Sequence, residues 1–130
     1  MHVLVDSLGR LLALVLSPGQ SSDHKYAPEL AGQAIAYHAQ TVIGDKGYDS
    51  DALREQIECA GLKSIIPFRK CRNVRPEIDR GRYKERNIVE RFIGKIKENR
   101  RVATRYDKKA NHFAGFLIMA AMKAWLKIIC

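Results

Sequence analysis

The chain has 130 residues, of which 46% are hydrophobic, so it is long enough for one ordinary domain with an apolar core. Its 23 Lys and Arg residues outnumber 14 Asp and Glu, which gives a formal net charge of +9. The basic residues crowd between Lys63 and Lys109. Because such an excess attracts polyanions, the charge favours nucleic acid as the partner, with a merely basic soluble protein as the alternative.

The cysteines and apolar runs exclude several other classes. Cys59, Cys71 and Cys130 form no Cys-x-x-Cys pair, and the four histidines are scattered singly, so neither a disulfide framework nor a zinc site is indicated. The apolar run at 11–16 is too short for a signal peptide, and the run at 113–122 falls short of the roughly 20 residues that span a bilayer. We therefore expect a cytoplasmic protein with reduced thiols and no membrane partner.

Residues 1–16 are predicted to form a hairpin. Two apolar runs, at 3–5 and 11–16, flank Asp6-Ser7-Leu8-Gly9, and Asp and Gly are typical of tight turns. Asp6 could be read as catalytic, but a turn-forming role is the preferred interpretation.

Residues 17–68 carry an alternating helix and strand pattern. A helix is expected from about residue 24 or 26 to 38, a short strand at 41–43, a helix from 51 to about 60, and another strand at 63–67. The strand at 41–43 leads into Gly44-Asp45. Its position places the Asp45 carboxylate at the carboxyl end of a strand, where open α/β sheets bind ligands.

The rest of the chain is predicted to be a basic loop followed by helices. Residues 69–82 lack periodicity and contain Pro76 and Gly81, so they form either a DNA-contacting arm or a solvated connector. Helices are expected at 83–101 and 111–129, the second of them apolar. The order of elements predicts a mixed α/β fold, in which helices flank one sheet.

The helix at 83–101 carries a polar stripe. Tyr83, Arg86, Glu90 and Lys97 fall within a sector about 60° wide, opposite the apolar side chains. Arg86 and Glu90 could be only a surface ion pair four residues apart. Alternatively, Asp45 and Glu90 could hold Mg²⁺, while Arg86 donates to a phosphate oxygen and Lys97 acts as a point charge on DNA.

The spacing of this stripe resembles the Tyr-Arg-Glu-Lys signature of bacterial insertion-sequence DDE transposases, notably the insertion-sequence-four and -five groups. Several flanking segments share the resemblance: Leu16-Ser17-Pro18-Gly19-Gln20, Gly44-Asp45-Lys46-Gly47-Tyr48-Asp49-Ser50, Ile66-Pro67, the segment at 83–92, and Arg101-Val102-Ala103-Thr104-Arg105-Tyr106-Asp107-Lys108. Together they cover nearly the whole chain.

The resemblance implies an RNase H-like catalytic domain in which three acidic residues bind two Mg²⁺ or Mn²⁺ ions. Asp45 matches the second aspartate and Glu90 the glutamate, while Tyr83, Arg86 and Lys97 would contact DNA. Water would attack a phosphodiester at the element's end, and the freed 3′-hydroxyl would then attack target DNA. Such a protein would be associated with the bacterial nucleoid.

The first catalytic aspartate of the family lies on a strand that precedes the segment matched here. The resemblance therefore implies that residues 1–130 form the C-terminal part of a catalytic domain that lacks its first strand, from a truncated copy or the downstream frame of a frameshifted transposase. We expect such a chain to cut DNA poorly alone, and to self-associate or pair with an upstream transposase fragment through an exposed sheet edge. The alternative is a non-catalytic remnant that binds DNA or full-length transposase.

Overall fold

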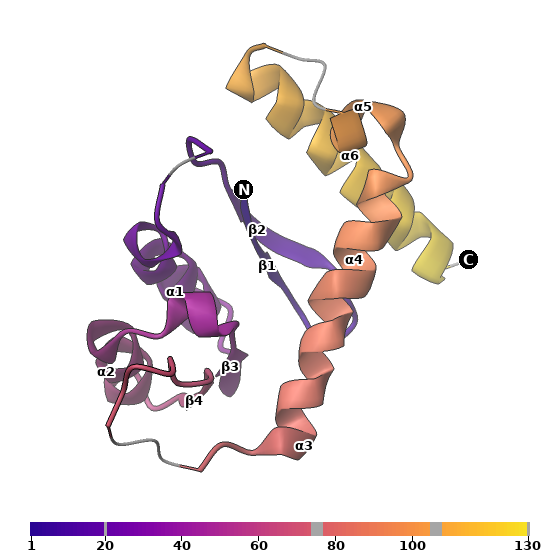
Figure 1. The fold of residues 1–130 in the computed structure, drawn as a ribbon. Coiled ribbons are helices and arrows are strands. Elements are labelled where there is room, and N and C mark those ends of the chain that lie inside the picture. The colour runs from indigo at the N-terminus through magenta and orange to yellow at the C-terminus, as the bar shows by residue number, and fades with distance from the viewer. Residues whose placement is uncertain (20, 74–76, 105–107, 130) are drawn as a thin grey trace. The chain divides into compact units, whose positions relative to one another are not determined.

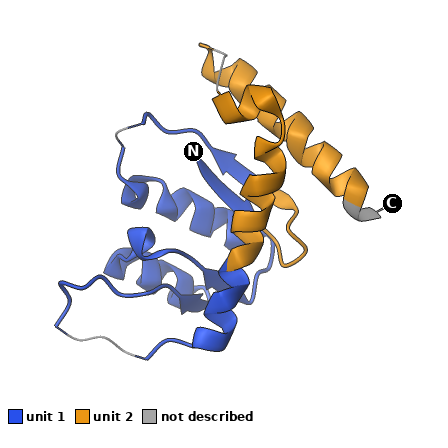
Figure 2. Cartoon of the chain, turned by 45° about the vertical axis from the view of Figure 1, so that its right-hand side comes forward, with its two compact units in different colours: residues 1–4, 13–86 blue, residues 5–12, 87–130 orange. Residues whose placement is uncertain are grey.

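The computed structural model describes residues 1–19, 21–73, 77–104 and 108–129, shown in Figure 1. The chain divides into two compact units, coloured separately in Figure 2. Unit 1 comprises Met1–Leu4 and Ala13–Arg86, and unit 2 comprises Val5–Leu12 and Asn87–Cys130. Each unit has its own buried apolar side chains, so the two are described in turn.

The predicted N-terminal hairpin is present. Strand β1 (His2–Val5) pairs with β2 (Leu11–Val15), and the turn end of the hairpin belongs to unit 2. The Asp6 carboxylate accepts hydrogen bonds from the backbone N–H groups of Leu8 at 3.0 Å and Arg10 at 2.9 Å. Gly9 has a φ of +77°, which favours glycine. Asp6 is therefore a turn residue, as its neighbours in the sequence predict.

Unit 1 is built around a strand, helix, strand arrangement. Strand β3 (Thr41–Ile43) runs parallel to β4 (Lys63–Ile65), and α2 (Asp51–Cys59) provides the crossover that parallel strands require. Helix α1 (Ala27–Ala36) packs against α2 and buries residues spaced three and four apart, which is the spacing of one helical face. The core of the unit consists of Ala27, Ala31, Leu53, Ile57 and Ile66, with Val42, Tyr48 and Leu62 packed against it.

The predicted helix at 83–101 is divided in the structure. It is replaced by α3 (Arg80–Tyr83), a 3₁₀ turn at Lys84–Arg86, α4 (Asn87–Lys97) and α5 (Arg100–Thr104). Helix α3 begins inside the predicted 69–82 loop because the Asp79 side chain caps it, accepting from the backbone N–H of Arg82 at 3.1 Å. The Asn99 carbonyl accepts from the N–H groups of Val102 and Ala103, which starts α5. Periodicity alone did not reveal these breaks, because a 3₁₀ turn barely disturbs it.

Unit 2 is a helical cluster. Helix α6 (Ala110–Ile129) agrees with the helix predicted at 111–129 and packs on α4 and α5. The turn end of the hairpin joins this unit, with the Arg10 guanidinium 5.9 Å from the Trp125 ring centroid. The core side chains of the unit are Phe92, Ile96, Val102, Phe113, Leu117, Ala120, Ala121 and Ala124.

The described residues have the predicted mixed α/β character, but their strands form two separate pairs, β1–β2 and β3–β4, in place of one sheet. Strands β3 and β4 have three residues each, so a further strand could form only a few backbone hydrogen bonds with either. Among the described residues, no helix is both long and apolar enough to span a membrane.

Candidate functional site

Asp45 lies at the carboxyl end of β3, as predicted. Just before it, the Gly44 backbone N–H donates to the Ile65 carbonyl at 3.1 Å. A Cβ at Gly44 would lie 3.2 Å from Ile66 Cγ1, so glycine permits the close approach of this loop to the end of β4. The Asp45 side chain accepts from the Lys46 backbone N–H at 2.7 Å and is 51% exposed. The structure thus presents this carboxylate to solvent at the end of the parallel pair.

Two further predicted residues lie beside Asp45. Arg86 Nη1 lies 3.3 Å from Asp45 Oδ2, and the Arg86 guanidinium lies 5.5 Å from the centroid of the Tyr83 ring. The segment is also held by Arg82, whose Nη1 donates to Thr41 Oγ1 at 3.1 Å. Residues that are distant in the sequence are therefore brought together in unit 1.

The other two predicted residues belong to unit 2. Glu90 and Lys97 are both exposed on α4. They are seven residues apart and therefore lie on the same face of the helix, while Phe92 and Ile96 on the other side are buried. The amphipathic pattern of this part of the helix is confirmed.

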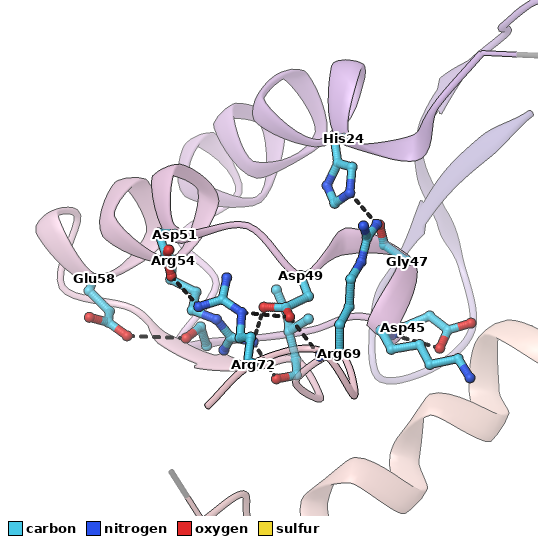
Figure 3. A network of polar contacts seen from close by, with 12 residues as sticks. His24, Asp45, Gly47, Asp49, Asp51, Arg54, Glu58, Arg69 and Arg72 are labelled. Carbon is cyan, nitrogen blue, oxygen red and sulfur yellow. Dashed lines mark hydrogen bonds and ion pairs between the residues drawn. The ribbon is translucent and has the colours of Figure 1, made fainter. Parts of the chain in front are cut away.

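Asp49 is a buried polar residue whose role the sequence did not reveal. Its carboxylate is fully buried and accepts three hydrogen bonds: from Arg54 Nη2 at 3.0 Å, from the Arg69 backbone N–H at 2.7 Å and from Arg72 Nε at 2.9 Å (Figure 3). Arg54 also donates to the Ile66 carbonyl at 2.7 Å. Asp49 therefore ties the start of α2 to the chain that follows β4.

The segment after β4 is fixed by further contacts of the same arginines. The guanidiniums of Arg54 and Arg72 lie 3.9 Å and 5.6 Å from the Phe68 ring centroid. Arg72 Nη1 donates to Asp51 Oδ1 at 2.6 Å, and Arg69 contacts His24 and the Gly47 carbonyl (Figure 3). The first residues of the predicted 69–82 loop are thus anchored to unit 1.

Two groups near Asp45 have displaced pKa values. Burial would raise the pKa of Asp49, but hydrogen bonds from Arg69 and Arg54 and the charge of Arg72 outweigh it and lower that pKa. Burial, with the negative charges of Asp23 and Asp45, raises the pKa of Tyr48 to about 12. At neutral pH, Asp49 is therefore ionised and Tyr48 is a neutral phenol, whose hydroxyl lies 3.0 Å from His2 Nδ1.

The donors near Asp45 partly suit a hard cation. Carboxylate oxygens are the ligands that Mg²⁺ prefers, and Asp45 offers them at an exposed strand end. Within the part of the chain that the structure describes, however, no group of three His, Cys, Asp or Glu side chains could hold a metal ion together. Asp45 could supply one carboxylate ligand in unit 1, and a metal ion bound there would need additional donors.

Comparison with known proteins gives a family match and similar proteins from two bacteria. The family described as the transposase DDE domain matches residues 1–126. A Brucella ovis protein, named as a presumed transposase for insertion sequence element IS6501, is 36% identical over 130 residues, which cover 98% of this chain and 97% of the relative. The transposase for insertion sequence element IS1106 of Neisseria meningitidis serogroup B is 30% identical over 135 residues, covering 99% of this chain but 43% of that relative.

No solved structure gives a significant match. The family match, which covers nearly the whole chain, and the relative of almost equal extent agree with the resemblance found from the sequence motifs. The chain belongs to the family of insertion-sequence transposases with a DDE domain.

Proposed function

We propose that the chain acts in the metal-dependent DNA cleavage and strand transfer of insertion-sequence transposition. The proposal assigns it to the insertion-sequence-four and -five type, with Tyr83, Arg86, Glu90 and Lys97 as the signature and an RNase H-like fold for the domain. The observation that carries it is a pair of contacts at the end of β3. Arg86 Nη1 lies 3.3 Å from Asp45 Oδ2, and the Arg86 guanidinium lies 5.5 Å from the centroid of the Tyr83 ring. The sequence predicts a functional role for all three residues, and α/β proteins bind ligands at the carboxyl ends of their strands.

In this proposal, Asp45 and Glu90 provide carboxylate ligands for Mg²⁺ or Mn²⁺, two ions being expected in a complete site. When bound, such ions stabilise the attacking and leaving oxygens of a phosphodiester displacement. The guanidinium of Arg86 pairs with Asp45 in the free protein and suits a DNA phosphate oxygen when DNA is present. Tyr83 and Lys97 complete the DNA contact, at the element ends and the target.

The proposal gives this chain two of the three acidic metal ligands of the family. The third acidic ligand that the resemblance implies is matched by none of the residues of the motifs, and no described group of three acidic or other metal-binding side chains exists. Loss of one metal ligand is expected to reduce the rate by orders of magnitude. We therefore propose that the chain cuts DNA weakly by itself and gains activity with a partner segment that supplies an aspartate.

A cleavage assay on a duplex carrying the end of the element tests this proposal. With Mg²⁺ and an added segment that carries the proposed strand and its aspartate, we expect cleavage that Asp45→Asn and Glu90→Gln each abolish. Glu29→Gln, an exposed change in the first turn of α1, is the matched control and should leave cleavage intact. Cleavage that survives Asp45→Asn would contradict the proposal.

A second candidate is a DNA-binding or transposase-interacting role without catalysis. The net charge of +9 and the lack of a described three-ligand cluster favour it. It predicts DNA binding, or inhibition of a full-length transposase, with no cleavage under any combination of metal and partner segment. The assay above separates the two candidates directly.

A further inference from the structure

The positive charge of the chain is divided unevenly between the two units. Unit 2, orange in Figure 2, has 11 Lys and Arg residues against four Asp and Glu, a formal charge of +7, whereas unit 1 has 12 against ten, a charge of +2. Within unit 2, the excess is concentrated at residues 95–109, where seven Lys and Arg accompany two acidic residues, Glu98 and Asp107. Most of the net charge is therefore carried by the unit that contains neither Asp45 nor Arg86.

Lys108 and Lys109 stand at the start of α6, where a cation does not favour the helix. The start of a helix carries a partial positive charge, so acidic side chains are preferred there, yet the first turn of α6 has none. The Lys109 carbonyl accepts from the Phe113 backbone N–H at 3.2 Å, which places Lys109 at the cap position that Ser, Thr, Asp and Asn usually occupy. Stability of the helix therefore does not explain the two lysines.

The cations of the two units also differ in their partners. In unit 1, Arg54, Arg72 and Arg86 each pair with a carboxylate. In unit 2, α5 and the start of α6 carry four exposed cations that we call the basic cluster: Arg100, Arg101, Lys108 and Lys109. Among the described residues, no carboxylate lies within ion-pair distance of any member of the cluster. Its charge is therefore available to an external anion.

Arg101 is the member of the basic cluster that a further contact holds in place. Its guanidinium lies 4.5 Å from the centroid of the Phe116 ring. Phe116 follows Lys109 by seven residues and so lies on the same face of α6, about 10 Å along the helix axis, with the exposed His112 between them. Because stacking uses the flat face of a guanidinium, the N–H donors at its edge can still bind a phosphate. A polyanion along this face of α6 would reach both Arg101 and Lys109.

We infer that the basic cluster binds the sugar-phosphate backbone of DNA without reading its sequence, as a contact separate from that of Tyr83, Arg86 and Lys97. This inference rests on the proposed function and deepens it, because it gives a role to both ends of the segment at 101–108, which the proposed function leaves without one. DNA fits the cluster because its phosphates are closely spaced and several cations can each neutralise one. Among the described residues at 97–110, no large apolar side chain is exposed, which favours a polyanion in water over insertion into a membrane.

The test measures binding of the full chain to a fluorescein-labelled DNA duplex of unrelated sequence, by anisotropy, without a divalent metal ion. The cluster variant combines four substitutions: Arg100→Gln, Arg101→Gln, Lys108→Gln and Lys109→Gln. It should reduce the slope of log K against log salt by about 3.6, at about 0.9 for each phosphate contact. Between about 50 and 200 mM salt, the affinity of the unchanged chain should therefore fall about 150-fold more than that of the variant.

A control variant removes the same charge from exposed positions elsewhere: Lys25→Gln, Lys63→Gln, Lys123→Gln and Lys127→Gln. It should keep the salt dependence of the unchanged chain, because none of these residues belongs to the cluster. An equal loss in the control would show that net charge alone attracts DNA, and would overturn the inference.

Two further sets of variants separate a loss of charge from a loss of folding. Arg100→Lys and Arg101→Lys with Lys108→Arg and Lys109→Arg keep the charge and should keep the salt dependence. Each half of the cluster variant, with two substitutions to Gln, should remove about half of the slope change while Tm stays as in the unchanged chain. Folded half variants that bind as the unchanged chain does would overturn the inference.

Arg86→Gln with Lys97→Gln separates this inference from the proposed function. If this variant loses binding while the cluster variant binds unchanged, only the inference is wrong. If the cluster variant loses binding and Arg86→Gln with Lys97→Gln does not, the inference stands and the DNA contacts of the proposed function are wrong. If the unchanged chain does not bind the duplex, both fail. Vesicles of phosphatidylserine and phosphatidylcholine that displace the duplex through the same four residues would overturn the assignment to DNA.

Discussion

Asp49 holds two separate segments of unit 1 to one carboxylate. It precedes α2, and its donors come from α2 and from the chain after β4. The residue lies four positions after Asp45, so the same contacts fix the loop on which Asp45 is carried. We interpret Asp49 as a positioning residue for that loop.

Asp49→Asn should lower the free energy of unfolding by about 2–4 kcal/mol, because it removes a fully buried negative charge that pairs with the partly buried Arg54 and Arg72. Urea unfolding at neutral pH measures this. Asp51→Asn is the matched control: Asp51 also pairs with Arg72, but its side chain is 82% exposed, so the effect should be small. Equal losses from the two substitutions would contradict the role assigned to Asp49.

The lowered pKa of Asp49 also predicts how stability depends on pH. A carboxyl group whose pKa is lower in the folded state stabilises the fold when ionised, above its unfolded pKa of about 4, and loses this contribution as pH falls through its folded pKa. The unchanged chain should therefore lose stability below about pH 4 more steeply than Asp49→Asn does. Parallel stability curves for both proteins between neutral and acid pH would contradict this.

The role of a residue could be predicted from the sequence where it depends on the residues next to it. Asp6 lies between two apolar runs and Asp45 ends one, so their positions followed from neighbouring residues. The partners of Asp49 could not be found in this way, since Arg69 and Arg72 are 20 and 23 residues further along the chain. They reach it only because the chain turns back after β4, and no spacing in the sequence encodes that path.

At the scale of elements, α4 is the part of the predicted helix that the structure retains as one piece. Its apolar residues and its polar stripe could be assigned from period 3.6, and the buried Phe92 and Ile96 agree with that assignment. The start of α3 was missed because capping by Asp79 depends on loop geometry. The hairpin pairing of β1 with β2 was predicted, but the single sheet was wrong, because order along the chain does not determine whether separate strand pairs join.

Ile96→Ala should destabilise unit 2 by about 2–5 kcal/mol, since Ile96 is completely buried and its removal leaves a cavity. Chemical unfolding followed by circular dichroism measures the loss. Lys95→Ala, at the adjacent exposed position, is the control and should change stability little. If Ile96→Ala were as stable as the control, the packing described for α4 would be wrong.

At the scale of the whole molecule, two features lead us to predict self-association. The described strands form pairs with free edges, and α6 exposes four large apolar side chains, Ile118, Met119, Met122 and Leu126. Sedimentation velocity should show larger species as the concentration rises. Met119→Lys with Met122→Lys should reduce them, whereas Tyr37→Lys, at an exposed aromatic residue of unit 1, should not. A monodisperse monomer at high concentration would contradict the prediction.

The proposed function assigns Asp45 and Glu90 to the same metal ions. Titration of the ¹⁵N-labelled chain with Mn²⁺ tests it without requiring cleavage, because the paramagnetic ion broadens the resonances of amides near the place where it binds. We predict that amides around Asp45 and around Glu90 broaden at the same Mn²⁺ concentrations, and that Asp45→Ala removes both effects. Broadening around Glu90 that persists unchanged in Asp45→Ala would contradict the account.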